Sequence, residues 1–426
     1  MVKLMKMKYF TIVFFLVLIL FQIQITPAVS ELSGFKNPEL IPLPKEVTEI
    51  HNTDYDTSNG KVNVVVTAKL SNGTNGIWFA SRDASSSKWN VKEIHIGPAK
   101  SCIAISMVDA NNGYILYSDY ETYLNYTLNS KIVLVSISDY SIQVLSKTNT
   151  SIITSCSLSK DSENNFFAEW YNGTINIAYK LSSQSTWTFL NNQNYLFYNI
   201  YGTSFLRFLE VYNTFNNTNM IDLNFVYLRQ GGNLQYSKIE YKQDMSNSYG
   251  GSGGSIGKEV TNIGNIIYNY EKGALVIPYE EQDGQYTTVK LVEISDTGTN
   301  IISINNPYFV QNINQIDPSI ALGANETYYA SFCNPNAFTV NISTYVGGTF
   351  PWKSQQINPT NIKAFNASIQ YANGVLNILY QDIGNAKLYY DNSNSQSAST
   401  PLTLIDIIPA FICLAIVYQK KRAKTK

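Results

Sequence analysis

The stretch that decides the fold is SIQYANGVLNILYQDIGNAKLYYDN, residues 368–392. It holds a short apolar segment, an Asn-Gly turn, a segment of alternating apolar residues and a third segment that ends in Leu-Tyr-Tyr. An Asn-Gly pair between alternating apolar segments is the strongest short-range signal for a β-hairpin. The stretch therefore predicts three antiparallel strands in a small meander.

The same unit recurs along the chain with a regular period. Its second turn residue advances by 53, 52, 54, 54, 53 and 48 residues through seven copies. These turn residues are Gly60, Gly113, Asn165, Asn219, Gly273, Glu326 and Gly374. One small sheet of this length cannot bury both of its faces alone, so the copies must stack on one another. The sequence therefore predicts an all-β protein, a seven-bladed β-propeller.

The two ends of the repeat predict how the ring closes. The seventh copy stops after its third strand, at Tyr390. An incomplete blade would expose strand edges that proteins normally cover. We therefore expect residues 40–43 to supply the missing outer strand of the last blade, and residues 47–51 to form the inner strand of the first.

Three of the five tryptophans stand at the start of a predicted outer strand, namely Trp89, Trp187 and Trp352. A large apolar ring at a repeated position typically fills the gap between neighbouring blades. These side chains are expected in the core and not in a ligand site.

The composition fits many short strands and argues against a nucleic-acid partner. The chain contains 31 Tyr and 20 Phe, and only 14% of its residues are charged. The 30 basic residues are balanced by 31 acidic ones, and five of the basic ones lie in the last seven positions. A surface without excess positive charge is poorly suited to a phosphate backbone.

The two ends of the chain predict export and attachment to a membrane. Three lysines, an apolar run at 9–21 and small residues up to Ser30 form the pattern of a cleaved secretory signal, with a retained anchor as the alternative. Residues 402–418 are mostly apolar and precede a basic tail, as in a membrane-spanning helix, with a buried strand as the alternative. The predicted organisation is a signal at 1–30, a propeller ectodomain at 31–394, a linker at 395–401, a transmembrane anchor at 402–418 and a cytoplasmic tail at 419–426. The expected location is the cell surface.

Export implies glycosylation and an oxidising environment. Eight N-x-[ST] sequences are candidate glycosylation sites: Asn72, Asn125, Asn149, Asn172, Asn216, Asn325, Asn341 and Asn366. Cys102 and Cys156 occupy equivalent positions in adjacent repeats, at the start of neighbouring inner strands. A disulfide between these two blades is therefore expected, which leaves Cys333 as a buried free thiol.

Three motifs look functional, but their context favours a structural role. The loop GGSGGSIGKEV has Ser252 and Glu259 where a phosphate-binding loop needs Gly and Ser or Thr, so a flexible surface loop is predicted. Asp296-Thr-Gly resembles an aspartic protease triplet, but no second copy completes a dyad, so a hairpin turn is predicted. Asp54, Asp56 and Ser58 resemble a calcium loop without its bidentate glutamate; a solvated turn is favoured, and calcium binding is left open.

The segment SRDASSSKW at residues 81–89 resembles the S-x-D-x-G-x-T-W box of sialidase-like propellers, although it has an extra residue and lacks the glycine. The resemblance covers about 350 residues of repeats and supports the architecture. A sialidase reaction would further need three arginines around a carboxylate, and none of the three in the ectodomain, Arg82, Arg207 and Arg229, lies in an Arg-Ile-Pro context. The low charge and the short anchor also resemble membrane-anchored surface proteins of thermoacidophilic archaea.

The sequence contains few residues of the types that catalytic and metal sites use. His51 and His95 are the two histidines of the chain, too few for a histidine metal cluster and a poor basis for a Ser-His-Asp triad. We predict no catalytic residue, no metal and no cofactor. The candidate ligand-binding residues are Arg207 and Glu210 on the inner strand of blade four, and Glu169 on the middle strand of blade three.

The favoured function is a non-catalytic surface module that binds a glycan or an envelope protein. A tyrosine-rich surface with many amides and hydroxyls suits stacking and hydrogen bonding to neutral sugars. The alternative is a sialidase-like or other glycan-acting hydrolase or lyase. A third interpretation is a subunit of a larger envelope assembly.

Overall fold

The computed structural model describes residues 34–35, 38–57, 60–83, 86–97, 102–123, 126–149, 152–190, 203–213, 220–229, 231–242, 244–245, 248–283, 286–295, 298–303, 316–345 and 352–393. For residues 121–123, 126–128, 203–213, 248–251, 283, 286 and 303 it describes the backbone alone. The predicted signal, anchor and tail lie outside these ranges. No helix within the described ranges is both long and apolar enough to cross a membrane.

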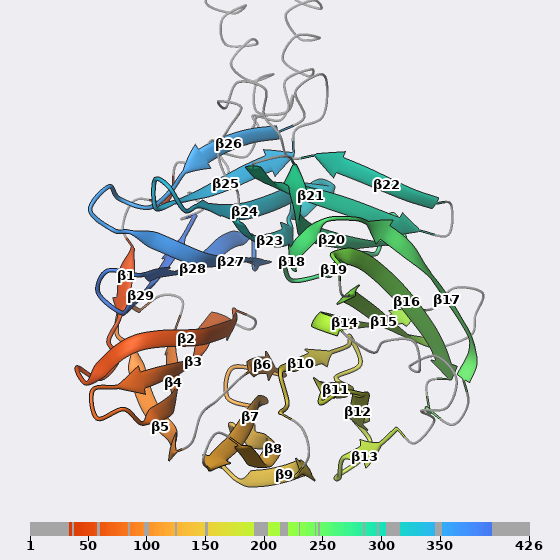
Figure 1. Cartoon of the computed structure of the whole chain (residues 1–426), viewed down its shortest axis with the longest axis horizontal. Helices are drawn as coiled ribbons and strands as arrows, with labels where there is room; N and C mark the ends of the chain where they lie inside the picture. Colours follow the sequence, from red (N-terminus) through yellow and green to blue (C-terminus); the bar gives the residue numbers. More distant parts are fainter. Residues whose placement is uncertain are drawn as a thin grey trace, which may run out of the picture. The chain divides into compact units, whose positions relative to one another are not determined.

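Seven antiparallel sheets make up Phe35–Ser393 and stand as seven blades around a central axis (Figure 1). In blades 1 to 4 the strands follow chain order from the axis outward. Blade 1 has β2 (Val47–Asp56), β3 (Lys61–Leu70), β4 (Asn75–Asp83) and β5 (Asn90–Gly97); blade 2 has β6 (Ile103–Met107), β7 (Gly113–Tyr123), β8 (Tyr126–Ser136) and β9 (Ile142–Thr148); blade 3 has β10 (Ser155–Lys160), β11 (Phe166–Tyr171), β12 (Ile175–Lys180) and β13 (Thr188–Phe189); blade 4 has β14 (Thr203–Asn213), β15 (Met220–Arg229), β16 (Asn233–Lys242) and β17 (Ser248–Gly257).

The last three blades complete the ring. Blade 5 has β18 (Val260–Ile263), β19 (Ile267–Asn269), β20 (Ala274–Asp283), β21 (Tyr286–Ser295) and β22 (Gly298–Ser303); blade 6 has β23 (Ile316–Leu322), the short 3-10 helix η4 (Ala324–Glu326), β24 (Tyr328–Asn334), β25 (Thr339–Tyr345) and β26 (Trp352–Gln356); blade 7 has β27 (Ala364–Ala372), β28 (Val375–Asp382), β29 (Lys387–Asn392) and β1 (Glu39–Ile41). The seven-bladed propeller is thereby confirmed. So is its closure, because β1 pairs with β29.

The middle strands are buried on both faces because every blade lies between two others. On β3, Val64 and Val66 pack toward blade 7, whereas Val65 packs toward blade 2. A strand with alternating neighbours on two sides needs apolar residues at every position, which explains the run KVNVVVTAKL. Of the three tryptophans predicted in the core, Trp187 and Trp352 are 9% and 2% exposed, and Trp89 is half-buried against the core between blades 7 and 1.

Side chains of one inner strand hold the backbone of the next. Asp54 Oδ2 accepts a hydrogen bond from the N–H of Ile105 at 2.8 Å, and Asp56 Oδ2 accepts one from Met107 at 3.0 Å. Both aspartates lie within β2, so the predicted solvated turn is wrong, and the first inner strand runs to Asp56 instead of His51. The carboxylates satisfy donors that a neighbouring blade is too distant to reach with its backbone.

The pattern recurs around the ring. Asn265 Oδ1 accepts from the N–H of Ile320 at 2.7 Å, and Ser319 Oγ accepts from Ile369 at 3.0 Å. At the closing seam, the side chain of Gln370 accepts from the N–H of Thr57 at 3.3 Å. In each case the acceptor belongs to one blade and the donor to the following blade.

The glycine-rich segment is a strand and not the flexible loop predicted from its composition. As β17 it pairs with β16 from Leu234↔Gly257 to Tyr241↔Ser248. An outer edge strand needs no side chains for packing, and a Cβ on Gly253 would lie 2.6 Å from the carbonyl oxygen of Tyr236. Composition alone misses this because glycine is depleted in strands on average.

A disulfide joins Cys102 of blade 2 to Cys156 of blade 3, with a Cα–Cα distance of 5.7 Å. That distance lies in the usual range for a disulfide. Cys333 is a free thiol and is fully buried.

We expect alkylation to reveal this pairing in the isolated protein. In the denatured, unreduced chain Cys333 should take up the reagent, while Cys102 and Cys156 should react only after reduction. Peptide mass spectrometry measures which cysteines are alkylated before and after reduction. Modification of Cys102 and Cys156 without reductant would contradict the pairing.

Replacing Asp54 with Ala should lower the free energy of unfolding by about 1–3 kcal/mol, because the buried N–H of Ile105 loses its acceptor. Chemical unfolding followed by tryptophan fluorescence measures the change. Glu49→Ala, at an exposed position of the same strand, is the matched control and should cost less than about 0.5 kcal/mol. Equal effects of the two substitutions would show that the inter-blade bond contributes nothing.

Candidate functional site

The residues predicted to bind a ligand lie on strands of two neighbouring blades, 3 and 4. Glu169 lies in the middle of β11, paired between Ser157 and Ile177, and is 0% exposed. Its side chain therefore has no accessible surface in this structure, and its binding role stays a prediction. Arg207 and Glu210 lie on β14, opposite Val226 and Leu223, and their side chains are outside the described part.

Arg82, which lies in the segment that resembles the sialidase box, has a structural role. Arg82 Nε lies 3.0 Å from Glu39 Oε2, and its guanidinium stands over the rings of Trp89 and Tyr390. Arg82 also donates to the carbonyl of Ser86 at 2.6 Å, which holds the turn of the SRDASSSKW segment. Asp83, the acidic residue of that segment, is exposed.

The other predicted motifs fall into the scaffold. β21 and β22 pair up to Ser295↔Gly298, and Asp296, predicted in a hairpin turn, lies outside the described residues. Among the described residues no group of three or more His, Cys, Asp or Glu side chains is arranged to hold a metal ion.

Glycosylation candidates occupy different environments. Asn72, Asn149 and Asn325 are exposed, and Asn172 and Asn366 are half-buried. Asn341 is only 7% exposed within β25, so the folded ring offers its amide poorly to an enzyme. Asn125 and Asn216 lie outside the described residues.

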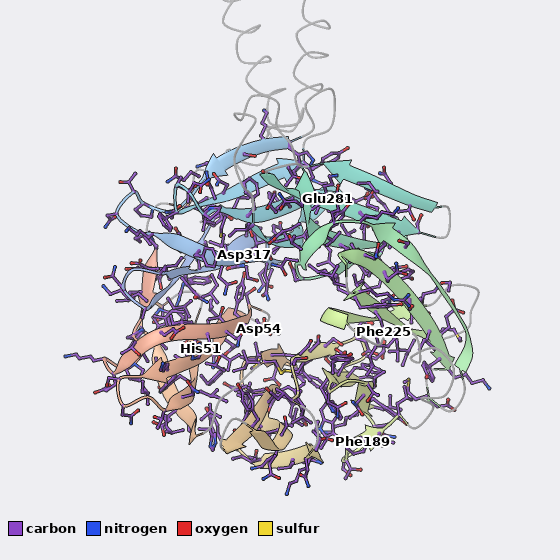
Figure 2. The ribbon with its side chains drawn as sticks, in the orientation of Figure 1. His51, Asp54, Phe189, Phe225, Glu281 and Asp317 are labelled. Atoms are coloured by element: carbon purple, nitrogen blue, oxygen red, sulfur yellow. A yellow bond between two sulfur atoms is a disulfide. The ribbon has the colours of Figure 1, made fainter. Side chains whose placement is uncertain are left out.

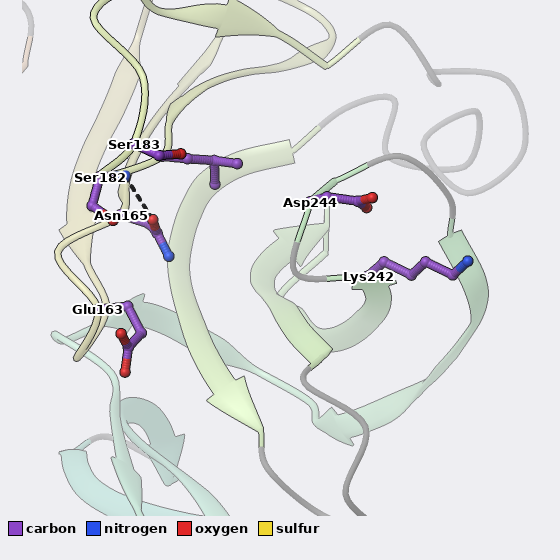
Figure 3. Close-up of a pocket in the computed structure, with 7 residues that line it drawn as sticks. Glu163, Asn165, Ser182, Ser183, Lys242 and Asp244 are labelled. Atoms are coloured by element: carbon purple, nitrogen blue, oxygen red, sulfur yellow. Dashed lines mark hydrogen bonds between the residues drawn. The ribbon is translucent and has the colours of Figure 1, made fainter.

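The turns of blades 3 and 4 line an open pocket of about 550 Å³ (Figure 3). Blade 3 contributes the turn between β10 and β11 and the segment after β12, and blade 4 contributes the end of β16. The lining residues are Glu163, Asn165, Leu181, Ser182, Ser183, Lys242 and Asp244. Sequence reasoning missed this site because its residues come from three turns of two blades.

Hydrogen bonds fix the blade 3 side of the pocket. Asp161 Oδ1 accepts from the N–H groups of Glu163 and Asn165, both at 2.8 Å. Asn165 Oδ1 then accepts from the N–H of Ser182 at 2.8 Å, the bond drawn in Figure 3. The two turns are therefore tied together, and the pocket wall is preorganised.

The pocket combines both signs of charge with neutral polar groups. Lys242 supplies a cation, Glu163 and Asp244 supply carboxyl groups, and the two serines supply hydroxyls. Burial raises the pKa of the nearby Tyr179, and the charge of Asp244 raises it further. Such a lining offers donors and acceptors to a ligand without a strong net charge.

A second group of titratable residues lies at the seam between blades 5 and 6. Glu280 Oε1 accepts from the N–H of Asp317 at 2.6 Å and from Asn262 at 3.0 Å, and its Oε2 accepts from Thr261 at 3.0 Å. Figure 2 shows Asp317 on the axis side of its blade. With its acceptor sites occupied in this way, Glu280 holds the two blades together.

Asp317 is a strained and poorly solvated acid. Its backbone has φ 54°, in the left-handed region. Burial, and then repulsion from Glu280, raise the pKa of Asp317 to about 6, and the N–H of Asn366 offsets part of this. Burial also raises the pKa of the Cys333 thiol, which argues against a nucleophilic role for this cysteine.

The pKa of Asp317 is higher in the folded than in the unfolded chain. The free energy of unfolding should therefore decrease as the pH rises from about 4 to about 6. Asp317→Asn should remove about 1–3 kcal/mol of this decrease. Chemical unfolding of the wild type and the variant at pH 4 and pH 7 measures the change in the free energy of unfolding. Glu46→Gln, at an exposed position, is the control. An unchanged pH dependence in Asp317→Asn would refute the assignment.

Comparison with known proteins identifies the fold and no family. No family model matches the chain, and neither does any curated protein. Solved structures that resemble it include Kuenenia stuttgartiensis hydrazine synthase (TM-score 0.50, 9% identity, 82% of this chain and 97% of that one) and polysaccharide lyase Uly1 (0.50, 10%, 87% and 94%). The NanB sialidase of Streptococcus pneumoniae follows with a TM-score of 0.46, 10% identity, and 84% and 70% coverage. At 9% and 10% identity, the two matches with a TM-score of 0.50 show a likeness of fold alone.

Proposed function

We propose that the protein is a cell-surface binding module, and that the pocket between blades 3 and 4 holds a neutral glycan without turning it over. The observation that carries the proposal is the pocket itself. Its volume of about 550 Å³ lies in the range of small-molecule sites. Its amide and hydroxyl groups, together with one cation and two carboxyl groups, suit a ligand rich in hydroxyls.

The use of the acids in the interior of the ring supports binding over catalysis. Glycoside hydrolysis needs two carboxyl groups placed about 5 to 9 Å apart on either side of the bond to be cleaved. Asp54, Asp56 and Glu280 instead accept hydrogen bonds from the backbone of the next blade, and Glu169 is fully buried. These four acids are therefore parts of the scaffold.

The disulfide and the positions of the N-x-[ST] glycosylation candidates support an extracellular location. A disulfide such as Cys102–Cys156 persists in oxidising compartments. Asn72 and Asn172 lie in turns between second and third strands, whereas the pocket lies among turns of the opposite face of the ring. Glycans at these positions would leave the pocket open.

A hydrolase or lyase is the second candidate, because the pocket holds two carboxyl groups, those of Glu163 and Asp244, beside the amine of Lys242. Acid–base chemistry at this site would depend on these groups. The two candidates therefore share one site and differ in whether the ligand is released unchanged.

Binding can be tested with the purified full chain and a panel of neutral oligosaccharides and sialosides, by calorimetry. We expect a neutral oligosaccharide to bind, and Ser183→Trp, which fills the pocket, to weaken it at least about tenfold, a loss of about 1.4 kcal/mol. Ser71→Trp, in an exposed turn of blade 1, should leave binding unchanged. Equal affinity of Ser183→Trp and the wild type would place the ligand elsewhere.

Turnover separates the two candidates. The same panel is incubated at acid and neutral pH and the products are analysed by chromatography. We expect none. Product formation that disappears in Glu163→Gln or Asp244→Asn would make the protein an enzyme.

A further inference from the structure

The outer strand of blade 4 differs from the outer strands of the other blades. β17 lies at the rim of the ring and has ten residues, whereas the other six outer strands have two to eight (Figure 1). It contains no charged residue and no proline. Four of the others, β1, β5, β9 and β26, carry a lysine or a glutamate, and the uncharged β13 and β22 are only two and six residues long. Charge, proline and short length normally protect an edge strand from pairing, and β17 lacks all three.

The outer side of β17 is open to solvent. The sheet order of blade 4 is β14-β15-β16-β17, so among the described strands β17 pairs with β16 and ends the sheet. Residues 252–255 are exposed. The register with β16 is regular over residues 250–255, and irregularities occur only toward its two ends. A regular edge strand presents unpaired N–H and C=O groups along its free side, so β17 can accept a further strand.

Gly254 has no structural reason within its own blade. A Cβ on its neighbour Gly253 would lie 2.6 Å from the carbonyl oxygen of Tyr236, so that position needs glycine. A Cβ on Gly254 would meet no atom within 4 Å, and its backbone is not in the left-handed region. Glycine inside a strand is destabilising relative to alanine. Strand glycines also mark places where another backbone approaches closely, and such an approach would account for Gly254.

The sequence of β17 is symmetric about Ser252. Gly250 and Gly251 precede this serine, and Gly253 and Gly254 follow it. When two copies of the strand run antiparallel with the two serines opposite each other, residue 251 lies opposite residue 253, and residue 250 lies opposite residue 254. Each glycine then faces a glycine of the other copy, so that the two backbones can approach closely. A two-fold interface requires such self-complementarity, because the same surface serves both subunits.

We propose that β17 is an interface between two copies of this chain, and that the two strands pair antiparallel about a two-fold axis at Ser252. The blade 4 sheets of the two copies then form one continuous sheet. A two-fold contact of this kind uses up both edges, so the assembly stops at a dimer. A second copy explains the symmetry of the Gly-Gly-Ser-Gly-Gly segment, which pairing with a strand of different sequence would leave unexplained.

A cysteine at the two-fold axis tests the pairing in the purified full chain. Opposite Cα atoms of antiparallel strands lie about 4.5–5.5 Å apart, a distance that a disulfide can bridge. Ser252→Cys should therefore give a covalent dimer on mild oxidation, visible on a non-reducing gel and lost on reduction. Gln143→Cys, at an exposed position of the outer strand β9, is the matched control and should give none. The wild type is the reference for links through the native cysteines.

Light scattering of the purified full chain measures the dimer without a cross-link. Gly254→Lys places a charged side chain between the two strands, at a position where the blade itself has room for it. It should raise the dissociation constant of the dimer at least about tenfold. Gln143→Lys, on the outer strand of blade 2, should leave the dissociation constant unchanged. If Gly254→Lys does not fold, the cross-link of Ser252→Cys still decides the question.

Three results would overturn the proposal. The first is a wild type that is monomeric at the concentrations of the cross-linking experiment, which would leave the edge to a strand of another protein. The second is equal cross-linking of Ser252→Cys and Gln143→Cys, which would indicate random collisions. The third is a folded Gly254→Lys variant that dimerises as tightly as the wild type, which would place the contact elsewhere on the ring.

Discussion

The ring depends on hydrogen bonds from the backbone of one inner strand to side chains of the preceding blade. Apolar packing between blades is strong, but it has no direction and would tolerate small slips of one sheet over another. The bonds from Ile105 and Met107 to Asp54 and Asp56 set the relative height of blades 1 and 2. Ser319 of blade 6 links both of its neighbours, because its hydroxyl donates to Asn265 of blade 5 and accepts from the N–H of Ile369 of blade 7.

The same constraint limits the chemistry that the interior of the ring can perform. An acid that accepts backbone N–H groups is fixed in position, and its oxygens are occupied. Glu280 shows this most fully, with donors from Asp317, Asn262 and Thr261. The residues that line the pocket between blades 3 and 4 belong instead to turns, where loops can vary without disturbing the scaffold.

Buried carboxyl groups give the ring an unusual response to pH. Most proteins are destabilised in acid because paired carboxylates become protonated. Here burial raises the pKa of both Asp317 and Asp391, and the charge of another carboxylate raises each further, so protonation relieves repulsion at both residues. Together with a charged fraction of only 14%, this favours a ring that tolerates acid.

The sequence by itself determined the all-β class, the seven blades, the closing strand and the core tryptophans. The sequence sufficed because the blades repeat about every 50 residues. The alternation of apolar residues that marks each strand is also a local property of the chain. The sequence did not determine the role of Asp54 and Asp56, the strand at β17 or the burial of Glu169. Each of these depends on which blade lies beside it: Asp54 is an acceptor only because Ile105 is adjacent, 51 residues later. The pocket also exists only in the tertiary structure, because Glu163, Ser182 and Lys242 come from separate turns that the ring brings together.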